Sequence, residues 1–300
     1  MSIERTDSGA ERTPGRQLRL MTHNIWNRDA NSREWEKQGF DCSAAVRVQG
    51  LLRVYRETQP DVIGCQEASA LMSDLLKQGF EAEGTGYTMI WGRFTPILYR
   101  PDRLELVDSA FGTYPETIDG MEGTFNDVKS KSWNIAVFRV KKSGRLFLFA
   151  TTHLWWKIEP TAEKPEGRSV QAGSDKAREL QLASLTARVR QMCARYKCPG
   201  FLVGDLNTGY LSQAVQAAFQ AGFRHAHDIA EDYAEEAVGY HYCFPDGFKT
   251  YYDERPFETA IDHILVYGAE PGMVKRFERY SPDYYFPISD HSPAYVDVVL

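Results

Sequence analysis

Short runs of β-branched and aromatic residues recur along the chain, each bounded by glycine, proline, aspartate or asparagine. Runs of this kind, set between residues that favour turns, predict β-strands. We expect strands at residues 18–22, 61–65, 87–91, 96–99, 135–140, 146–152, 201–203, 261–267 and 294–300. Their number and spacing favour a fold built mainly on β-sheets.

Apolar residues also recur at helical spacing in two longer segments. Residues 43–58 and 174–196 each place apolar side chains three or four positions apart, which predicts helices. Ser174 or Asp175 is a natural N-cap for the second helix. Many strands with a few helices outside them predict a two-sheet sandwich with α+β or α/β layering. Shorter helices are expected at residues 71–78 and 212–220.

The length and composition fit one large domain. The 300 residues are 43% hydrophobic, and no linker, internal repeat or low-complexity tract divides them. Residues 1–16 are polar, so we expect a flexible N-terminal tail followed by a single domain over residues 17–300. The tail lacks the apolar run of a secretory signal, and no segment is long and apolar enough to suggest a membrane span.

Charge and cysteine content narrow the classes of partner and compartment. Lys and Arg total 35 against 41 Asp and Glu, a formal net charge of −6. General affinity for nucleic acid usually rests on a basic surface, so the acidic balance weakens that interpretation, although a local basic patch would suffice. The five scattered cysteines favour reduced thiols in the cytoplasm over a disulfide framework.

Polar residues that could take part in catalysis or metal binding stand at the ends of the expected strands. Alternation along a strand would put Asp205 and Asn207 on one face, but the same pair is also typical of an Asx turn. Glu67 is equally consistent with a helix start, and His153 with a buried structural histidine. The complete set is Asn24, Glu67, His153, Asp205, Asn207, Asp262, Asp290 and His291.

Taken in order along the chain, these residues match a known pattern. The sequence resembles the endonuclease/exonuclease/phosphatase superfamily over essentially its whole length after the tail. The most specific matches are Gly204-Asp205-Leu206-Asn207 and Ser289-Asp290-His291-Ser292-Pro293, and the segments DVIGCQE and AIDHI add to them. The resemblance implies an α/β fold in four layers, a sandwich of two stacked mixed β-sheets flanked by helices, with the site at one edge.

The resemblance also implies a divalent metal, Mg²⁺ or Mn²⁺. Phosphate esters repel an attacking water, and a hard cation with oxygen ligands offsets the negative charge of the reaction. Glu67 is the strongest candidate ligand, and Asn24 and Asp290 are weaker or water-mediated partners.

The remaining site residues are expected to act on water and phosphate. Asp205 and Asn207 would hold the attacking water and one phosphoryl oxygen. His291 would pair with Asp262, which orients the imidazole and stabilises its charged form. His153 would donate a hydrogen bond to a non-bridging oxygen or protonate the leaving group. The sequence does not decide whether Asp205 or His291 is the general base.

One position departs from the family pattern. In deoxyribonucleases of the pancreatic type, a second glutamate pairs with the histidine that corresponds to His153. In this chain the comparable stretch, WGRFTPILYRP, carries Arg93 there, which cannot accept a proton. The partner of His153 is therefore open, and Arg93 is either a phosphate contact or, as we favour, a surface residue.

Aromatic residues beside the strand ends are the candidate substrate contacts. Trp155 follows the His153 strand directly, and neighbouring tryptophans on a strand do not both face inward, so Trp155 or Trp156 is expected to line the cleft. We also expect substrate contacts from Trp133 and, within a long polar-aromatic loop, His241. Local positive charge would come from Lys129, Lys131 and Lys157.

These features favour hydrolysis of a small phosphate ester, such as a sugar phosphate. The alternative is a nuclease or an enzyme that processes nucleic-acid ends, because aromatic residues with a few lysines also bind single strands. A binding protein that has lost the activity is a third alternative. No segment resembles an amphipathic membrane anchor.

Overall fold

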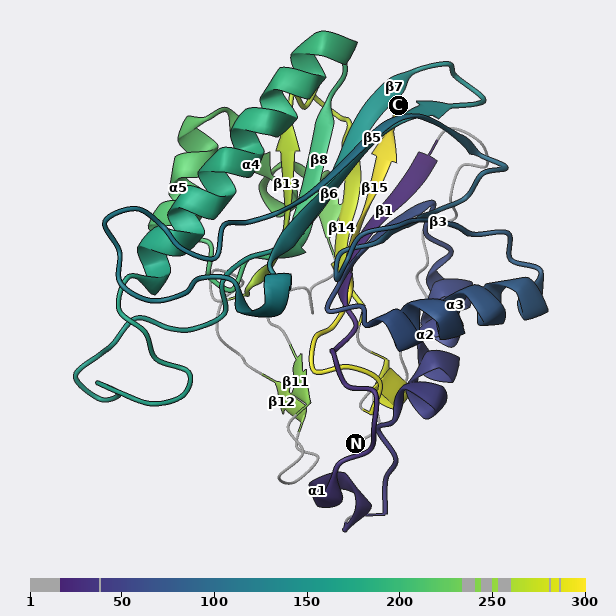
Figure 1. The fold of residues 1–300 in the computed structure, drawn as a ribbon. Helices are drawn as coiled ribbons and strands as arrows, with labels where there is room; N and C mark the ends of the chain where they lie inside the picture. The colour runs from purple at the N-terminus through teal and green to yellow at the C-terminus, as the bar shows by residue number, and fades with distance from the viewer. Residues whose placement is uncertain are drawn as a thin grey trace.

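The computed structural model describes residues 17–37, 39–233, 241–243, 250–252, 260–280, 282–285 and 287–300. The expected tail, residues 1–16, lies outside the described residues. Two mixed β-sheets stack face to face, and helices cover their outer faces (Figure 1). The structure therefore has the α/β four-layer arrangement that the sequence predicted.

The first sheet contains both the first and the last strand. Within the described residues it has seven strands. Strand β1 (Gln17–Asn24) lies at its centre, parallel to β2 and antiparallel to β15. Across the sheet the order is β10 (Asp232–Tyr233), β14 (Val274–Arg279), β15 (Ala294–Val299), β1, β2 (Val62–Gln66), β4 (Ile97–Tyr99) and β3 (Thr88–Ile90).

The second sheet has six strands among the described residues. A parallel pair, β7 and β8, lies at its centre, with antiparallel strands on both sides. Across the sheet the order is β5 (Leu104–Thr113), β6 (Ser132–Val140), β7 (Leu146–His153), β8 (Gly200–Asp205), β13 (Asp262–Tyr267) and β9 (Phe223–His225). A separate two-stranded ribbon pairs β11 (His241–Cys243) with β12 (Thr250–Tyr252).

Helices complete the four layers. α2 (Ala44–Thr58) and α3 (Ala70–Glu83) cover the first sheet, while α4 (Ser174–Tyr196) and α5 (Gln213–Gln220) cover the second. The shorter elements are α1 (Arg33–Glu36), α6 (Ala226–Ile229) and the 3₁₀ turns η1 (Asp127–Lys129) and η4 (Asp283–Tyr285). Among the residues that the structure describes, no helix has the length and apolar character needed to cross a membrane.

Separate apolar cores join the layers. Leu20 and Val62 of the first sheet pack against Phe149 and Phe201 of the second, which forms the core between the sheets. Alternate residues of the same strands face outward, so that Ile63 packs under α2 and α3, and other residues pack under α4 and α5. The strands are therefore apolar on both faces, which explains their nearly continuous hydrophobic runs.

The predicted elements match observed ones in type and approximate position. Two longer strands, β5 and β14, were not predicted, because their polar and apolar residues mix without a clean apolar run. The predicted N-cap of α4 is wrong. The capping position is Gly173, and Glu159 accepts hydrogen bonds from the backbone amides of Gly173 and Asp175.

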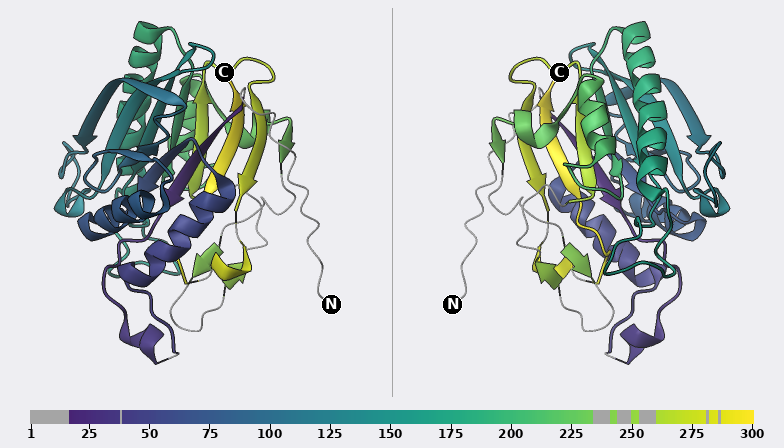
Figure 2. Two further views of the ribbon diagram at one scale, coloured as in Figure 1. Left: turned by 90° about the vertical axis from the view of Figure 1, so that its right-hand side faces the viewer. Right: turned by 90° about the vertical axis from the view of Figure 1, so that its left-hand side faces the viewer.

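Strand direction brings several chain segments to one edge of the sandwich. The carboxyl ends of β1, β2, β7 and β8 meet there with the amino ends of the antiparallel strands β13 and β15. The side views in Figure 2 place the C-terminus at the other end of the sheets from α1, which follows β1. The predicted catalytic and metal-binding residues lie at these strand ends or within a few residues of them, whereas the predicted substrate contacts Trp133 and His241 lie on β6 and β11.

Candidate active site

The candidate site is the polar end of the core between the two sheets. On β8, Phe201 and Val203 face this core, and alternation brings Asp205 to the same face. On β7, His153 continues the face that carries Phe149 in the same way. A buried apolar surface thus ends in titratable side chains without any change of strand register.

Strand pairing sets three of these side chains next to one another. His153 is opposite Asp205, and Asp205 is opposite Asp262, on the adjacent strands β7, β8 and β13. Gly204 permits this close pairing, because a β-carbon at that position would lie 2.0 Å from the carbonyl oxygen of Thr152. Steric crowding therefore explains why the GDLN motif begins with glycine.

A polar layer separates the apolar core from the site. Gln66 Nε2 donates to the hydroxyl oxygens of Thr22, at 3.1 Å, and Thr151, at 2.8 Å. It also donates to the carbonyl oxygen of Gly64 at 2.9 Å. These residues come from both sheets and are fully buried, so the layer ties the sheets together directly under the site.

The first sheet contributes Asn24 and Glu67 from strand ends and loops. Glu67 lies just past β2 with φ of 58°, a left-handed conformation that is costly for a non-glycine residue. Its Oε2 accepts a hydrogen bond from the amide of Asn27 at 2.8 Å. Asn24 Oδ1 accepts from the amide of Trp26 at 3.1 Å. Backbone amides of the loop after β1 therefore orient both polar side chains.

The segment that carries Asp290 and His291 is tied to β1 and to η4. Ser289 Oγ donates to the carbonyl oxygen of Asn24 at 2.7 Å and accepts from the amide of His291 at 3.2 Å. The hydroxyl of Tyr285 donates to the carbonyl oxygen of His291 at 2.5 Å. Ser289 belongs to the predicted motif, but the sequence did not indicate this supporting role.

Arg47 of α2 joins the same loops through hydrogen bonds to their backbone. Its guanidinium is buried and donates hydrogen bonds to five backbone carbonyls. Three of the acceptors lie in the loop that follows β1, and another is Ile288, two residues before Asp290. Sequence reasoning missed Arg47, since an arginine on a helix is normally a surface residue.

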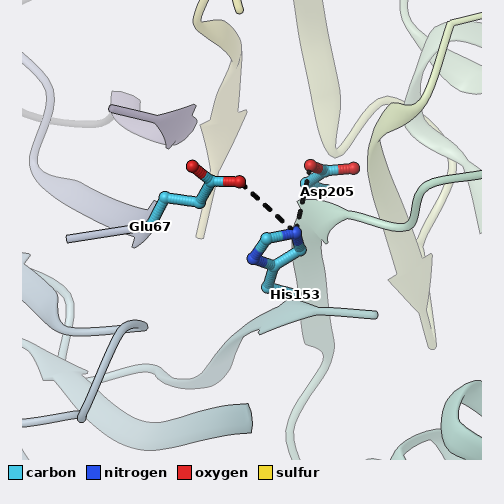
Figure 3. Close-up of side chains that lie close together, drawn as sticks. All are labelled: Glu67, His153 and Asp205. Atoms are coloured by element: carbon cyan, nitrogen blue, oxygen red, sulfur yellow. Dashed lines mark ion pairs between the residues drawn. The ribbon is translucent and has the colours of Figure 1, made fainter. Parts of the chain in front are cut away.

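Side chains from the two sheets meet at Asp205. Its Oδ2 accepts a hydrogen bond from Asn24 Nδ2 at 3.0 Å and lies 3.4 Å from His153 Nε2. His153 Nε2 also lies 3.8 Å from Glu67 Oε1 (Figure 3). The structure thus brings together residues that are up to 181 positions apart in the sequence.

His291 and Asp262 form the close pair that the sequence predicted. His291 Nδ1 lies 2.7 Å from Asp262 Oδ2, and His291 Nε2 lies 3.9 Å from Asp205 Oδ2. Burial lowers the pKa of His291, but the charges of Asp262 and Asp205 outweigh it and raise this pKa well above its usual value. His291 is therefore a cation at neutral pH, held by one carboxylate and turned toward another.

The carboxyl groups respond to the same crowding. Burial raises the pKa of Asp205 to about 7, with a further increase from the charge of Asp262 and a decrease from His291. Burial also raises the pKa of Asp290 to about 6, and the charge of Glu67 adds to the rise. Buried oxygens that resist ionisation in this way are stabilised when a cation binds among them.

The donor set fits a divalent cation with oxygen ligands. Glu67, His153 and Asp205 each present a ligand atom, and these atoms all lie within 4.8 Å of one another. Asp290 Oδ1 is buried, and among the described residues it has no hydrogen-bond partner. A buried carboxylate oxygen that has no partner among the described residues, and on which the charge of Glu67 acts, matches the oxygen coordination that Mg²⁺ and Mn²⁺ prefer.

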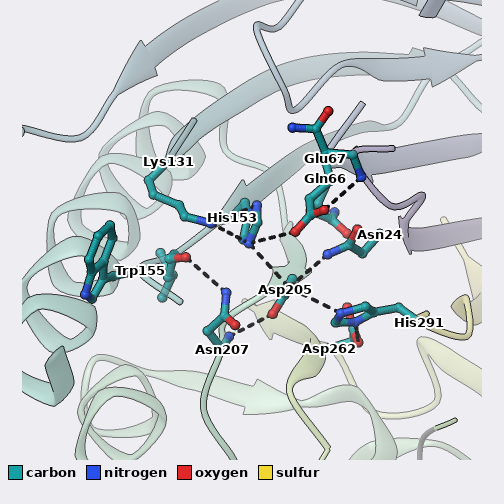
Figure 4. A network of polar contacts seen from close by, with 12 residues as sticks. Asn24, Gln66, Glu67, Lys131, His153, Trp155, Asp205, Asn207, Asp262 and His291 are labelled. Carbon is teal, nitrogen blue, oxygen red and sulfur yellow. Dashed lines mark hydrogen bonds and ion pairs between the residues drawn. The ribbon is translucent and has the colours of Figure 1, made fainter. Parts of the chain in front are cut away.

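Lys131 is the neighbour of His153 that replaces the expected acidic partner. Its ammonium lies 2.8 Å from His153 Nε2, as Figure 4 shows, and the side chain is buried. Burial lowers the pKa of His153 well below its usual value, and the charge of Lys131 lowers it further. His153 is therefore a neutral imidazole. The sequence placed Lys131 near the site but did not distinguish it from Lys129.

Asn207 reaches the site by a route that differs from the predicted one. Strand β8 ends at Asp205, and Asn207 has φ of 51°, so strand alternation does not place it. Its backbone N–H donates to Asp205 Oδ1 at 2.9 Å and so closes an Asx turn. Its side-chain Nδ2 donates to the carbonyl oxygen of Leu154 at 3.1 Å. The turn that was the structural alternative is thus what positions Asn207 beside Asp205.

The structure places the rings of Trp155 and Trp133 away from the site, whereas the alternative contact, Trp156, stays a prediction. Trp155 is completely buried against Phe125, so its ring does not reach a substrate. Trp133 packs on the opposite side of its sheet, in the core under α4, where the guanidinium of Arg188 covers its ring. Trp156 is half-buried and donates from Nε1 to Asp127 Oδ2 at 3.1 Å.

Two further candidates are not part of the described cluster. Arg93 is exposed, and its guanidinium lies above the ring of Phe94, consistent with the surface role that we favoured. His241 lies on β11, but its side chain falls outside the described part of the structure. Its predicted contact with substrate therefore stays a prediction.

Comparison with known proteins identifies the pattern independently. The model of the endonuclease/exonuclease/phosphatase family matches residues 21–291. The match spans every predicted site residue. No curated protein matches the chain.

Solved structures share the whole fold. A family protein from Bacteroides thetaiotaomicron is 21% identical, with a TM-score of 0.70 and 95% of each chain covered. A mannosyl-6-phosphatase from the same organism is 22% identical, with a TM-score of 0.70 and coverage of 94% of this chain and 100% of the other. D. rerio TDP2 in complex with a single-strand DNA product is 18% identical, with a TM-score of 0.61 and coverage of 94% and 98%. At these identities the likeness establishes the fold.

Proposed function

The chain belongs to the endonuclease/exonuclease/phosphatase family, and from this premise we propose that it is a Mg²⁺- or Mn²⁺-dependent phosphoesterase for a small phosphorylated metabolite, such as a sugar phosphate. One observation carries the proposal. Oxygen ligands from the first sheet lie beside two buried cationic side chains, Lys131 and His291, at one edge of the sandwich. Such a site binds a metal and an anionic oxygen at the same time.

Glu67 and Asp290 would hold the metal, with Asn24 close to them. The bound cation would offset the charge of the phosphoryl group and help to orient it. Asn24 also donates to Asp205, so that it fixes the carboxylate next to the ligands. We assign Asn24 a supporting role at the metal for that reason.

Asp205 is the proposed acceptor for the proton of the attacking water. Two donors, Asn24 Nδ2 and the amide of Asn207, fix the orientation of its carboxylate. His291 is a poor acceptor while Asp262 keeps it charged, and it would instead donate to a phosphoryl oxygen. His153, as a neutral imidazole, would add a hydrogen bond to the phosphoryl group. Asn207 would position the water.

The substrate class rests on charge and on chemistry at the site. The net charge of −6 does not favour a long polyanion, whereas buried cations suit a compact phosphate group. The structural neighbour named as a mannosyl-6-phosphatase is consistent with a sugar phosphate. The free thiols of Cys42, Cys65 and Cys193 are consistent with a reducing, cytoplasmic compartment.

A screen of phosphorylated sugars and other metabolites, with release of inorganic phosphate as the readout, tests the proposal. We expect turnover of at least one phosphomonoester with Mg²⁺ or Mn²⁺, loss of turnover in EDTA and recovery when the metal is restored. Full activity after exhaustive dialysis against chelator would exclude the metal mechanism. No turnover of any phosphate ester would favour a binding protein on the same fold.

A nuclease or end-processing enzyme is the second candidate. Trp156 is half-buried, and the ammonium of Lys157 lies 5.8 Å from its ring centre, a combination that also suits single-stranded nucleic acid. A structural neighbour, TDP2, was solved with a single-strand DNA product. An enzyme of this kind should lose affinity steeply with salt, because each neutralised phosphate releases counterions. A small phosphomonoester should show only a modest salt effect on KM.

A further inference from the structure

Lys131 is held in place by its backbone, immediately before β6. Its amide donates to Asn126 Oδ1 at 2.7 Å, and its carbonyl oxygen accepts from Asn126 Nδ2 at 2.9 Å and from the amide of Tyr114 at 3.0 Å. The side chain is 4% exposed. A lysine with this little freedom is placed by the fold, unlike a lysine on a solvated surface.

The ammonium group has an unusual environment. Its one hydrogen-bond partner within the described residues is His153, with Nζ 2.8 Å from Nε2 and 3.3 Å from Nδ1, and a neutral imidazole accepts at only one of these nitrogens. No carboxylate of the described residues lies within ion-pair distance, although the charges of Glu67 and Asp205 act on it from farther away. A buried ammonium is costly unless an anion compensates it, and His153 supplies none.

We propose that Lys131 is a substrate-binding residue whose ammonium donates to the non-bridging oxygens of a terminal phosphate, which makes the site selective for phosphomonoesters over phosphodiesters. This inference rests on the proposed function and deepens it. Lysine has three N–H donors and no acceptor, and His153 uses one of them. The ammonium contacts the same ring nitrogen, His153 Nε2, that lies 3.4 Å from Asp205 Oδ2, so it stands beside the proposed catalytic carboxylate.

Charge explains the selectivity. A phosphomonoester carries close to two negative charges at neutral pH, while a diester carries one and replaces an anionic oxygen with a second ester oxygen. An acidic partner of His153 would repel the second charge, whereas a buried cation attracts it. Because the interaction is screened little at a buried position, it discriminates between the two classes of ester.

The test uses Lys131→Met, which keeps the length of the side chain and removes its charge. Lys129→Met is the matched control, because Lys129 is exposed two residues away and the formal charge changes equally. Substrates are p-nitrophenyl phosphate and bis(p-nitrophenyl) phosphate with saturating Mg²⁺. We expect kcat/KM for the monoester to fall about 10²-fold in Lys131→Met and for the diester about tenfold or less. Lys129→Met should leave both nearly unchanged.

Binding of inorganic phosphate to the metal-free protein, measured by calorimetry, gives a readout that does not depend on turnover. We expect weaker phosphate binding in Lys131→Met than in the wild type and in Lys129→Met. Thermal unfolding checks that each variant is folded, and Lys131→Gln replaces Lys131→Met if the latter does not fold. An unchanged ratio of monoester to diester turnover, or equal phosphate affinity in folded variants, would overturn the inference.

Failure of the proposed function looks different. If the wild type cleaves only diesters or nucleic acid, the small-phosphomonoester function is wrong. Phosphate binding then decides the role of Lys131 separately. Loss of phosphate affinity in Lys131→Met alone would still support an anion-binding role, whereas equal loss in Lys129→Met would reduce it to general surface charge.

Discussion

On the second sheet, His153, Asp205 and Asp262 belong to three adjacent strands, and their pairing fixes their spacing. On the first sheet, the candidate metal ligands Glu67 and Asp290 lie just outside their strands, in loops. The site thus has a strand half, which is the set of residues on the second sheet, and a loop half, which is the set of residues just outside the strands of the first sheet. Pairing in a sheet positions side chains directly, whereas loops need additional bonds to achieve the same precision.

The loop half receives those bonds from residues that take no part in the chemistry. Arg47 satisfies five carbonyls, and Ser289 joins its own loop to the end of β1. Left-handed backbone occurs in both halves, at Trp26 and Glu67 in the loop half and at Asn207 just past β8. The comparison suggests that changes of the site residues His153, Asp205 and Asp262 in the strand half will affect catalysis more than stability, while changes in the loop half will affect metal affinity and stability together.

Asp205→Asn should have the largest effect, because it removes the proposed proton acceptor from the strand half. We expect kcat to fall by about 10³-fold or more, within the range for general acid–base groups. Folded stability at pH 8 should change little, since losing a carboxylate near Asp262 offsets the altered bond from Asn24. Steady-state kinetics and thermal unfolding measure the two quantities. A large drop in stability with intact kcat would contradict the assignment.

Glu67→Gln should weaken metal binding in the loop half. The amide oxygen still accepts from Asn27, so the loop keeps its hydrogen bond, but the negative charge is lost. We expect Mn²⁺ to bind about 10²-fold more weakly, as judged by calorimetry, with activity partly recovered at high metal concentration. Glu81→Gln, at an exposed position on α3, is the control and should bind Mn²⁺ like the wild type. Equal affinity in both variants would exclude Glu67 as a ligand.

Arg47→Met tests whether the buried clamp supports the metal side. Its removal leaves backbone carbonyls without their donor, so we expect a loss of about 3 kcal/mol in the free energy of unfolding and several-fold weaker Mn²⁺ binding. Arg53→Met on the same helix removes an exposed ion pair with Glu57 and the contact of the guanidinium with the Tyr284 ring, and it leaves no buried carbonyl without a donor, so it should change much less. Denaturant unfolding of both variants gives the comparison. If the two behave alike, the clamp has no special role.

The smallest expected effect is a gradual loss of folding stability in acid, caused by a buried histidine on β13 in the strand half. His263 Nε2 donates to the carbonyl oxygen of Thr208 at 2.8 Å, so Nδ1 accepts from His225 at 3.2 Å, and burial lowers the pKa of His263 to about 4. In the unfolded chain this histidine binds a proton near pH 6.5, so the free energy of unfolding falls as the pH drops from about 6.5 to about 4, by at most about 1.4 kcal/mol per pH unit.

His263→Gln removes this titration. We expect its free energy of unfolding to vary less between pH 6.5 and pH 4 than that of the wild type, even if the variant is less stable overall. Urea unfolding at several pH values measures the difference in slope. Parallel curves would show that other groups cause the acid sensitivity.

The sequence determined the elements and the chemical types. Long apolar runs such as residues 146–152 and 201–203 are strands because both of their faces are buried, which leaves little room for another period. The polar residues that end them stand out for the same reason, since a polar group next to a buried strand must face either water or a partner. That signal is local and marked Glu67, His153 and Asp205 as candidates, while the order of the matching motifs along the chain assigned them to one predicted site.

Only the tertiary structure decided which neighbours those residues have. Nothing local separates Lys131, buried at 4% exposure, from exposed Lys129, because burial depends on the strand that lies across it. Trp155 and Trp156 are adjacent, yet Trp155 is buried with Phe125 and with Ala177 of α4, while Trp156 is only half-buried. Arg47 meets its five carbonyls through contacts up to 241 residues away. Distance in sequence carries no information about such contacts, because they form only when the sheets stack.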